Sequence, residues 1–173
     1  MPGVFVVTDS SCDLEQEDAD PFPIEIVPLT IRFGTDEFTD RRDLSVEDFY
    51  RRMASADDLP QTACPSPGAF AQAFGNASDA GADAVLCLTI SSDLSTTYQS
   101  ALAAAAAFEG PMVVHVMDSR SVSSGLGTLV IEAAKMAAEG GSSPCISPQS
   151  CRPRLAPPWQ PSGRELPSQP RSH

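Results

Sequence analysis

The sequence lacks long hydrophobic runs and is poor in positive charge. No stretch approaches the ~18 consecutive apolar residues of a membrane-spanning helix, so we expect no integral membrane segment. The chain has 173 residues, with 11 Lys and Arg against 23 Asp and Glu, and a formal net charge of −12 at pH 7. So acidic a chain offers no broad surface that attracts phosphate backbones or anionic lipids. We therefore expect no nucleic-acid partner.

Paired cysteines are also missing. The five cysteines are odd in number, and no two stand in a Cys-x-x-Cys pair. This usage argues against a disulfide framework or a zinc site and is typical of reduced thiols. It predicts a cytoplasmic location. The cysteines are Cys12, Cys64, Cys87, Cys145 and Cys151.

The composition changes near residue 141. Residues 142–173 hold 4 Arg against 1 Glu, whereas residues 1–141 hold 7 Lys and Arg against 22 Asp and Glu. Eight of the 16 prolines also lie in residues 142–173. Because proline interrupts both helices and strands, and few apolar residues accompany it, we expect residues 142–173 to be a Pro/Arg-rich disordered tail. Residues 1–141 are enough for one domain with a hydrophobic core.

The most informative stretch begins with the apolar run 84–90, which reads as a central parallel strand buried on both faces. Hydroxyl residues follow, among them Ser91, Ser92 and Ser95. In an open α/β sheet, ligands bind where such strands end, and a helix N-terminus favours an anion there. The same serines would equally serve as turn and N-cap residues. A helix is predicted after these serines, because apolar residues recur at spacings of three and four: Leu94, Tyr98, Leu102 and Ala105.

Two further apolar runs end in Asp-Ser. The run 3–7 leads into Asp9 and Ser10, and the run 112–117 leads into Asp118. Asp9 is placed either to bind a ligand or to cap a short helix through an Asx turn. Strands that alternate with helices through short loops indicate an α/β fold, with a largely parallel sheet flanked by helices.

Between these runs, residues 24–33 alternate as a second strand, with Pro28 at an edge or a bulge. Residues 34–40 read as a turn and a return strand. Ser45 then opens a helix that we expect to turn Phe49, Tyr50 and Met53 inward.

Thr62 precedes another predicted helix start. Ser66 is a good N-cap and Pro67 a good first residue for a helix with Phe70 and Phe74 inward. Thr62 should therefore lie in a proline-stiffened loop just before this helix, where a threonine commonly has a structural role.

An enzymatic alternative is available from the same residues. Asp9, Asp13 and Asp118 could hold Mg²⁺ for phosphoryl transfer, and Ser92 could act as a nucleophile. No glycine-rich phosphate loop accompanies the acids, and no G-x-S-x-G elbow surrounds Ser92. Gly125-Leu126-Gly127 lacks the third glycine of a dinucleotide fingerprint. We therefore expect that the protein is not an enzyme and that it has no cofactor and no metal site.

Taken together and in order, the motifs of residues 4–141 resemble the DegV family. They are Val7-Thr8-Asp9-Ser10-Ser11, Ile26-Val27-Pro28-Leu29, Phe33-Gly34, Asp43-Leu44, Phe49-Tyr50, Pro60-Gln61-Thr62, Pro65-Ser66-Pro67, Ile90-Ser91-Ser92, Thr97-Tyr98-Gln99-Ser100 and Val116-Met117-Asp118-Ser119.

The resemblance implies a carrier of long-chain fatty acids built from two α/β domains, with the acyl chain in a tunnel. In the family, a Thr and a Ser of the first domain hold the carboxylate, and these positions fall on Thr62 and Ser92. Asp9, Ser10, Ser91 and Ser95 would support the site loops. The family also implies presentation of the bound acid to a fatty acid kinase.

The chain departs from the family pattern in places. Ser95-Thr96-Thr97 stands where Ser-Gly-Thr is usual, so a flexible turn residue is lost. The pattern stops near Gly141, and the second domain is missing. Such a change suggests a truncated or frameshifted reading frame, and it leaves a non-functional fragment as an alternative.

Overall fold

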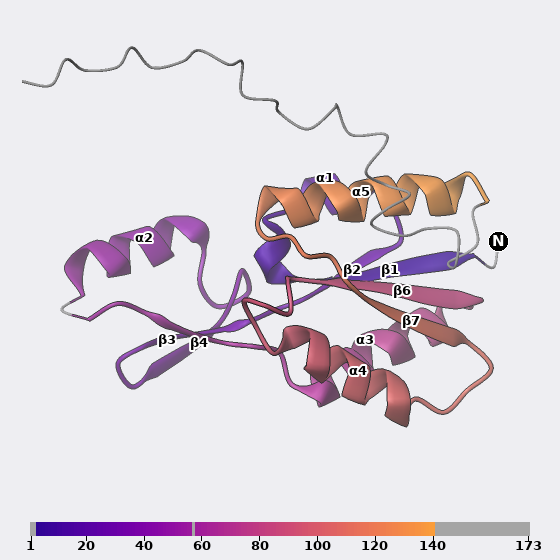
Figure 1. The fold of residues 1–173 in the computed structure, drawn as a ribbon. Helices are drawn as coiled ribbons and strands as arrows, with labels where there is room; N and C mark the ends of the chain where they lie inside the picture. Colours follow the sequence, from indigo (N-terminus) through magenta and orange to yellow (C-terminus); the bar gives the residue numbers. More distant parts are fainter. Residues whose placement is uncertain (1–2, 57, 141–173) are drawn as a thin grey trace, which may run out of the picture.

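Two β-sheets organise the chain (Figure 1). The computed structural model describes residues 3–56 and 58–140. The larger sheet is parallel, with strand order β2-β1-β6-β7, and consists of β1 (Val4–Asp9), β2 (Ile24–Val27), β6 (Ala84–Thr89) and β7 (Val113–Asp118). The smaller sheet is antiparallel, with order β4-β3-β5, and consists of β3 (Thr30–Phe33), β4 (Asp36–Thr39) and β5 (Gln61–Ala63).

Helices cover both faces of the parallel sheet (Figure 1). One face carries α1 (Gln16–Ala19) and α5 (Ser124–Ala138), and the other carries α3 (Pro67–Asp79) and α4 (Thr97–Ala107). Because parallel strands must be joined by crossovers, each later strand of this sheet follows a helix in the chain. The remaining helix, α2 (Val46–Ser55), lies beside the smaller sheet, where the Phe33 and Phe49 rings meet edge to face.

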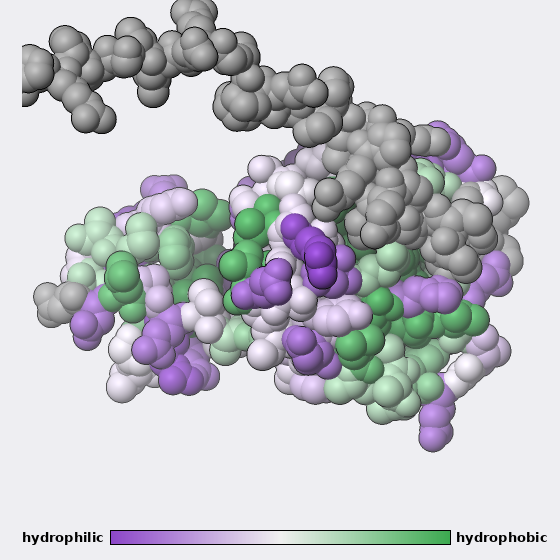
Figure 2. Space-filling model, in the orientation of Figure 1, coloured by the Kyte–Doolittle hydropathy of each residue, from purple (hydrophilic) through white to green (hydrophobic). Residues whose placement is uncertain are grey.

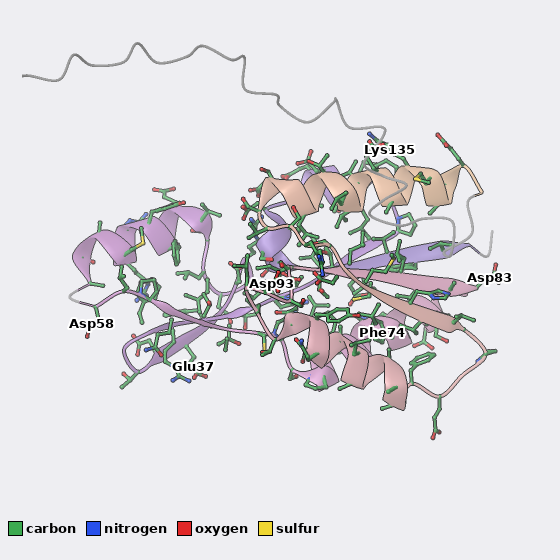
Figure 3. The ribbon with its side chains drawn as sticks, viewed as in Figure 1. Glu37, Asp58, Phe74, Asp83, Asp93 and Lys135 are labelled. Carbon is green, nitrogen blue, oxygen red and sulfur yellow. The ribbon has the colours of Figure 1, made fainter. Side chains whose placement is uncertain are left out.

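The core consists of two layers, one on each face of the parallel sheet. Val6 and Leu86 point toward Val130 of α5, whereas Val7 points toward Phe74 of α3. These five side chains and that of Phe70 have no exposed area. Figure 3 shows Phe74 between the sheet and its covering helices. The prediction of a largely parallel sheet flanked by helices is confirmed. The doubly buried strand predicted at 84–90 is β6, which ends one residue earlier, at Thr89.

The predicted helix starts at Ser45 and Ser66 are confirmed. The Ser45 hydroxyl accepts the Asp48 N–H at 3.1 Å, and the Ser66 hydroxyl accepts the Ala69 N–H at 3.2 Å. After α5, Gly140 takes a φ of +87°, a left-handed conformation that suits glycine at a helix end.

Residues 24–33 form two strands in different sheets, so the prediction of one strand was wrong. Pro28 has no N–H to give a ladder, and the chain leaves the parallel sheet there. The next N–H, of Leu29, donates instead to the Ser10 hydroxyl at 3.0 Å. The inward placement of Tyr50 was also wrong. Its side chain is 59% exposed, because α2 is covered on one side alone and has no fully buried residue.

The helix predicted from the spacing of Leu94, Tyr98, Leu102 and Ala105 forms as α4, but the leucines do not mark its buried face. Leu94 is 65% exposed and Leu102 is 41% exposed. Small side chains in the contact allow two helices to lie close together, and α4 packs tightly on α3 and the sheet through such residues. Its buried face consists of Thr97, Ser100, Ala101 and Ala104.

The tail predicted for residues 142–173 lies outside the described residues. Within 3–56 and 58–140, none of the helices combines the length and the apolar character needed to cross a bilayer.

Candidate ligand site at the carboxyl edge of the sheet

The loops after β1, β6 and β7 meet at the carboxyl edge of the parallel sheet. Asp83 and Asp93, labelled in Figure 3, flank the two ends of β6, and Asp93 marks the edge nearer the smaller sheet. Figure 2 shows hydrophilic side chains gathered over the middle of this face, where β6 and β7 end. Ligands of open α/β sheets bind at this edge.

Asp9 ends β1 and fixes two neighbouring loops. Its carboxylate has no exposed area and accepts the Ser11 N–H at 3.1 Å, the Ser11 hydroxyl and the Ile90 N–H at 2.9 Å. Burial raises the pKa of Asp9, while the hydrogen bonds from Ser11 and Ile90 act in the opposite direction. Asp9 thus caps the short 3-10 helix η1 (Ser10–Cys12), as one of the two alternatives predicted, and it also holds the end of β6.

Ser91 and Ser95 shape the turn between β6 and α4. The Ser91 N–H donates to the Ser121 carbonyl at 2.9 Å, and the Ser91 hydroxyl accepts the Asp93 N–H at 3.3 Å. The Ser95 hydroxyl accepts the Thr97 N–H at 3.3 Å and lies 2.9 Å from the Thr97 hydroxyl. Both serines therefore have the turn-forming role that was one of the two interpretations of this stretch.

Ser92 is bonded to the neighbouring strand. Its hydroxyl donates to Asp118 Oδ2 at 2.6 Å, and its N–H donates to Asp118 Oδ1 at 3.2 Å. The Arg120 N–H also donates to Oδ1, at 2.9 Å. Partial burial acts to raise the pKa of Asp118, but the hydrogen bonds from Ser92 and Arg120 outweigh it and hold the pKa below its usual range. Asp118 is therefore an anion at neutral pH.

Thr62 lies in β5, opposite Ile31 of β3, and is exposed. The prediction of a loop was wrong, because three residues added to the edge of β3 leave no periodic pattern in the sequence. The residues after Thr62 reach the start of α4: Cys64 Sγ lies 3.2 Å from the Thr96 hydroxyl, and the Ser100 hydroxyl donates to the Pro65 carbonyl at 2.6 Å.

The structure therefore sets the Thr62 segment against the start of α4, just beyond the Ser92 loop. Ser10 lies apart from these residues, because its hydroxyl is bonded to the Leu29 N–H in the connection from β2 to β3. Sequence reasoning missed Asp118 as the partner of Ser92. The signal was present, since Asp118-Ser119 follows the strand that pairs with β6.

The three acids of the enzymatic alternative are engaged separately. Asp13 accepts the Ser123 hydroxyl and pairs with Arg41 at 3.3 Å, whereas Asp9 and Asp118 lie on β1 and β7 with β6 between them. Among residues 3–56 and 58–140, no group of three or more His, Cys, Asp or Glu side chains is placed to hold a metal ion.

A parallel sheet whose carboxyl edge carries hydroxyl groups and backbone N–H groups has the arrangement at which open α/β domains bind their ligands. Residues 4–147 match the family model described as "Uncharacterised protein, DegV family". A DegV domain-containing protein of Clostridium perfringens is 34% identical over 140 residues, which are 81% of this chain and 50% of that protein. The chain belongs to the DegV family.

Solved structures agree with this membership. A DegV family protein of Thermus thermophilus, described by its fatty acid binding, has a TM-score of 0.76 at 32% identity and matches 88% of this chain and 53% of its own. A stearic acid-binding protein of Eubacterium ventriosum has a TM-score of 0.70 at 30% identity, over 80% of this chain and 48% of its own. This chain spans about half the length of the relatives that it matches. The resemblance and the fold class predicted from the sequence are confirmed.

Proposed function

We propose that this chain binds long-chain fatty acids and that the hydroxyl groups of Thr62 and Ser92 hold the carboxyl group. The observation that carries the proposal is the meeting of the Thr62 segment and the Ser92 loop at the start of α4, through the Cys64–Thr96 and Pro65–Ser100 contacts. Fatty acid binding by the Thermus thermophilus and Eubacterium ventriosum relatives supports the choice of ligand.

An exposed apolar side chain follows Ser92 closely in the chain. Leu94, two residues after Ser92, is 65% exposed, so it offers a contact for the first methylenes of an acyl chain. Each methylene removed from water is worth roughly 0.8 kcal/mol, so the acyl chain supplies most of the affinity while the hydroxyl groups orient the headgroup.

Binding without catalysis fits the separation of Asp9, Asp13 and Asp118, each of which is engaged by its own donors. Presentation of the acid to a fatty acid kinase and a cytoplasmic location stay predictions.

The test is a calorimetric titration of the whole chain with decanoic, dodecanoic and tetradecanoic acids below their micellar concentrations. Burial of the acyl chain predicts affinity rising about fourfold per methylene. Leu94→Ala should weaken binding, whereas Val113→Ala, an exposed apolar residue at the opposite end of the sheet, should not. Absence of saturable binding, or affinity independent of chain length, would contradict the proposal and favour the non-functional fragment.

A further inference from the structure

The hydroxyl proton of Ser92 already takes part in a hydrogen bond within the protein. A serine hydroxyl donates one hydrogen bond and accepts up to two. The one proton of Ser92 lies in its 2.6 Å hydrogen bond to Asp118 Oδ2. Toward a ligand on its other side, Ser92 therefore presents lone pairs.

The ionised state of Asp118 gives this hydrogen bond its direction. Two backbone N–H groups, of Ser92 and Arg120, donate to Oδ1, and they stabilise a carboxylate. The Arg120 guanidinium, on the loop after β7, also favours the charged form.

The other titratable groups near this edge lie on the surrounding elements. On the Ser92 loop, Asp93 is exposed, and on β1 the Asp9 carboxylate is bonded to the Ile90 N–H. On β7, His115 points to the opposite face from Asp118, because side chains alternate along a strand. Thr89 of β6, opposite Asp118, is uncharged, and α4 carries no Asp, Glu, Lys, Arg or His. None of these groups supplies a proton between Ser92 and its ligand.

A carboxylate anion on the free side of Ser92 would place two negative oxygens around a single O–H group, which is unfavourable. We propose that Asp118 is a positioning residue that turns Ser92 into a hydrogen-bond acceptor, so that the fatty acid binds with its carboxyl proton. This inference rests on the proposed function of the same site. Each bound fatty acid anion takes up one proton from solution, the acid O–H donates to Ser92 Oγ, and Thr62 donates to the acid carbonyl.

The substitution Asp118→Asn should reverse the direction of the hydrogen bond between residue 118 and Ser92. Both backbone hydrogen bonds go to Oδ1, and the Ser92 hydroxyl alone goes to Oδ2. An amide with its oxygen in the Oδ1 position keeps the two backbone bonds and places its NH₂ group against Ser92 Oγ. The NH₂ group then donates to Ser92, and the Ser92 proton is released for an anionic headgroup.

The experiment titrates the whole chain with dodecanoic acid by calorimetry, in buffers of different ionisation enthalpy, from about pH 6 to about pH 8. A carboxyl group ionises at a pKa of roughly 4 to 5, so the wild-type dissociation constant should rise about tenfold per pH unit, with proton uptake near one per ligand. Dodecanesulfonate, which cannot take up a proton at these pH values, should not bind.

Asp118→Asn should bind both dodecanoate and dodecanesulfonate without proton uptake and with no dependence on pH. Asp93→Asn removes a neighbouring exposed charge and should behave as the wild type. Wild-type binding without proton uptake would overturn this inference and leave the proposed function standing. No binding of dodecanoic acid at any of these pH values would overturn both. If Asp118→Asn fails to fold, wild-type proton uptake alone decides.

Discussion

Asp9→Asn is the substitution that should most clearly expose how the site edge is held together. In the wild type, Oδ2 accepts the buried Ile90 N–H at 2.9 Å, and Oδ1 accepts the Ser11 N–H at 3.1 Å and the Ser11 hydroxyl. Asparagine offers one carbonyl oxygen, so its NH₂ group must face a donor on one side. A buried donor without a partner costs about 1–3 kcal/mol, and we expect a loss of that size in unfolding free energy at pH 7.

The pH dependence of the unfolding free energy provides a second test of the Asp9→Asn substitution. Burial raises the pKa of Asp9 above its ordinary value of 3.8, so the folded state binds this proton more readily than the unfolded state. The carboxyl group therefore stabilises the folded state more as the pH falls through the folded pKa toward 3.8, and asparagine lacks this contribution. The difference between wild type and variant should widen as the pH is lowered from 7.

Urea denaturation of the whole chain measures both effects. Ser11→Ala is the matched control: it removes one donor to Asp9 but leaves the Ser11 and Ile90 N–H groups bonded, so its loss should be smaller. Equal stability of Asp9→Asn and wild type at pH 7, or a difference that narrows at lower pH, would refute the reasoning.

Two further predictions concern packing and thiol reactivity. A Cβ at Gly127 would lie 2.5 Å from the Cys12 carbonyl oxygen, so Gly127→Ala should cost about 1–3 kcal/mol in urea denaturation. Gly75→Ala meets no atom within 4 Å inside α3 and should stabilise by up to about 1 kcal/mol, and the reverse order of the two variants would contradict the packing. Burial raises the pKa of Cys12 to about 11 and also raises that of Cys87, so iodoacetamide should modify the partly exposed Cys64 before either, as located by peptide mass spectrometry. Equal rates at the three thiols would show that the core opens readily.

Much of the parallel half of the fold could be predicted because its signals are local. The run 84–90 is apolar throughout, and Ser66 with Pro67 marks a helix start without reference to the rest of the chain. The phase of α4 could not be predicted in this way. Its alanines favour a helix on every face, and the fit against α3 decides which of them are buried.

The site was harder to predict than the fold, because its contacts join distant segments. Ser92 and Asp118 are 26 residues apart, and Cys64 and Thr96 are 32 residues apart. The family resemblance selected Thr62 and Ser92, but the short strand β5 exists only as an addition to β3. The sequence shows a proline at position 28, which indicates an interruption of the strand. It does not show that the chain passes from one sheet to the other there.

The central claim is that Thr62 and Ser92 hold the carboxyl group of a fatty acid, and alanine substitution with a matched control tests it most directly. Dodecanoic acid affinity would be measured for the wild type, Thr62→Ala, Ser92→Ala and Ser95→Ala, with folding of each checked by circular dichroism. Loss of one hydrogen bond to the headgroup, worth about 1–2 kcal/mol, predicts about five- to thirtyfold weaker binding for Thr62→Ala and for Ser92→Ala. Ser95→Ala, which loses a bond within the turn, should bind as the wild type does. Full affinity in both site variants, with weakened binding in Ser95→Ala, would contradict the account.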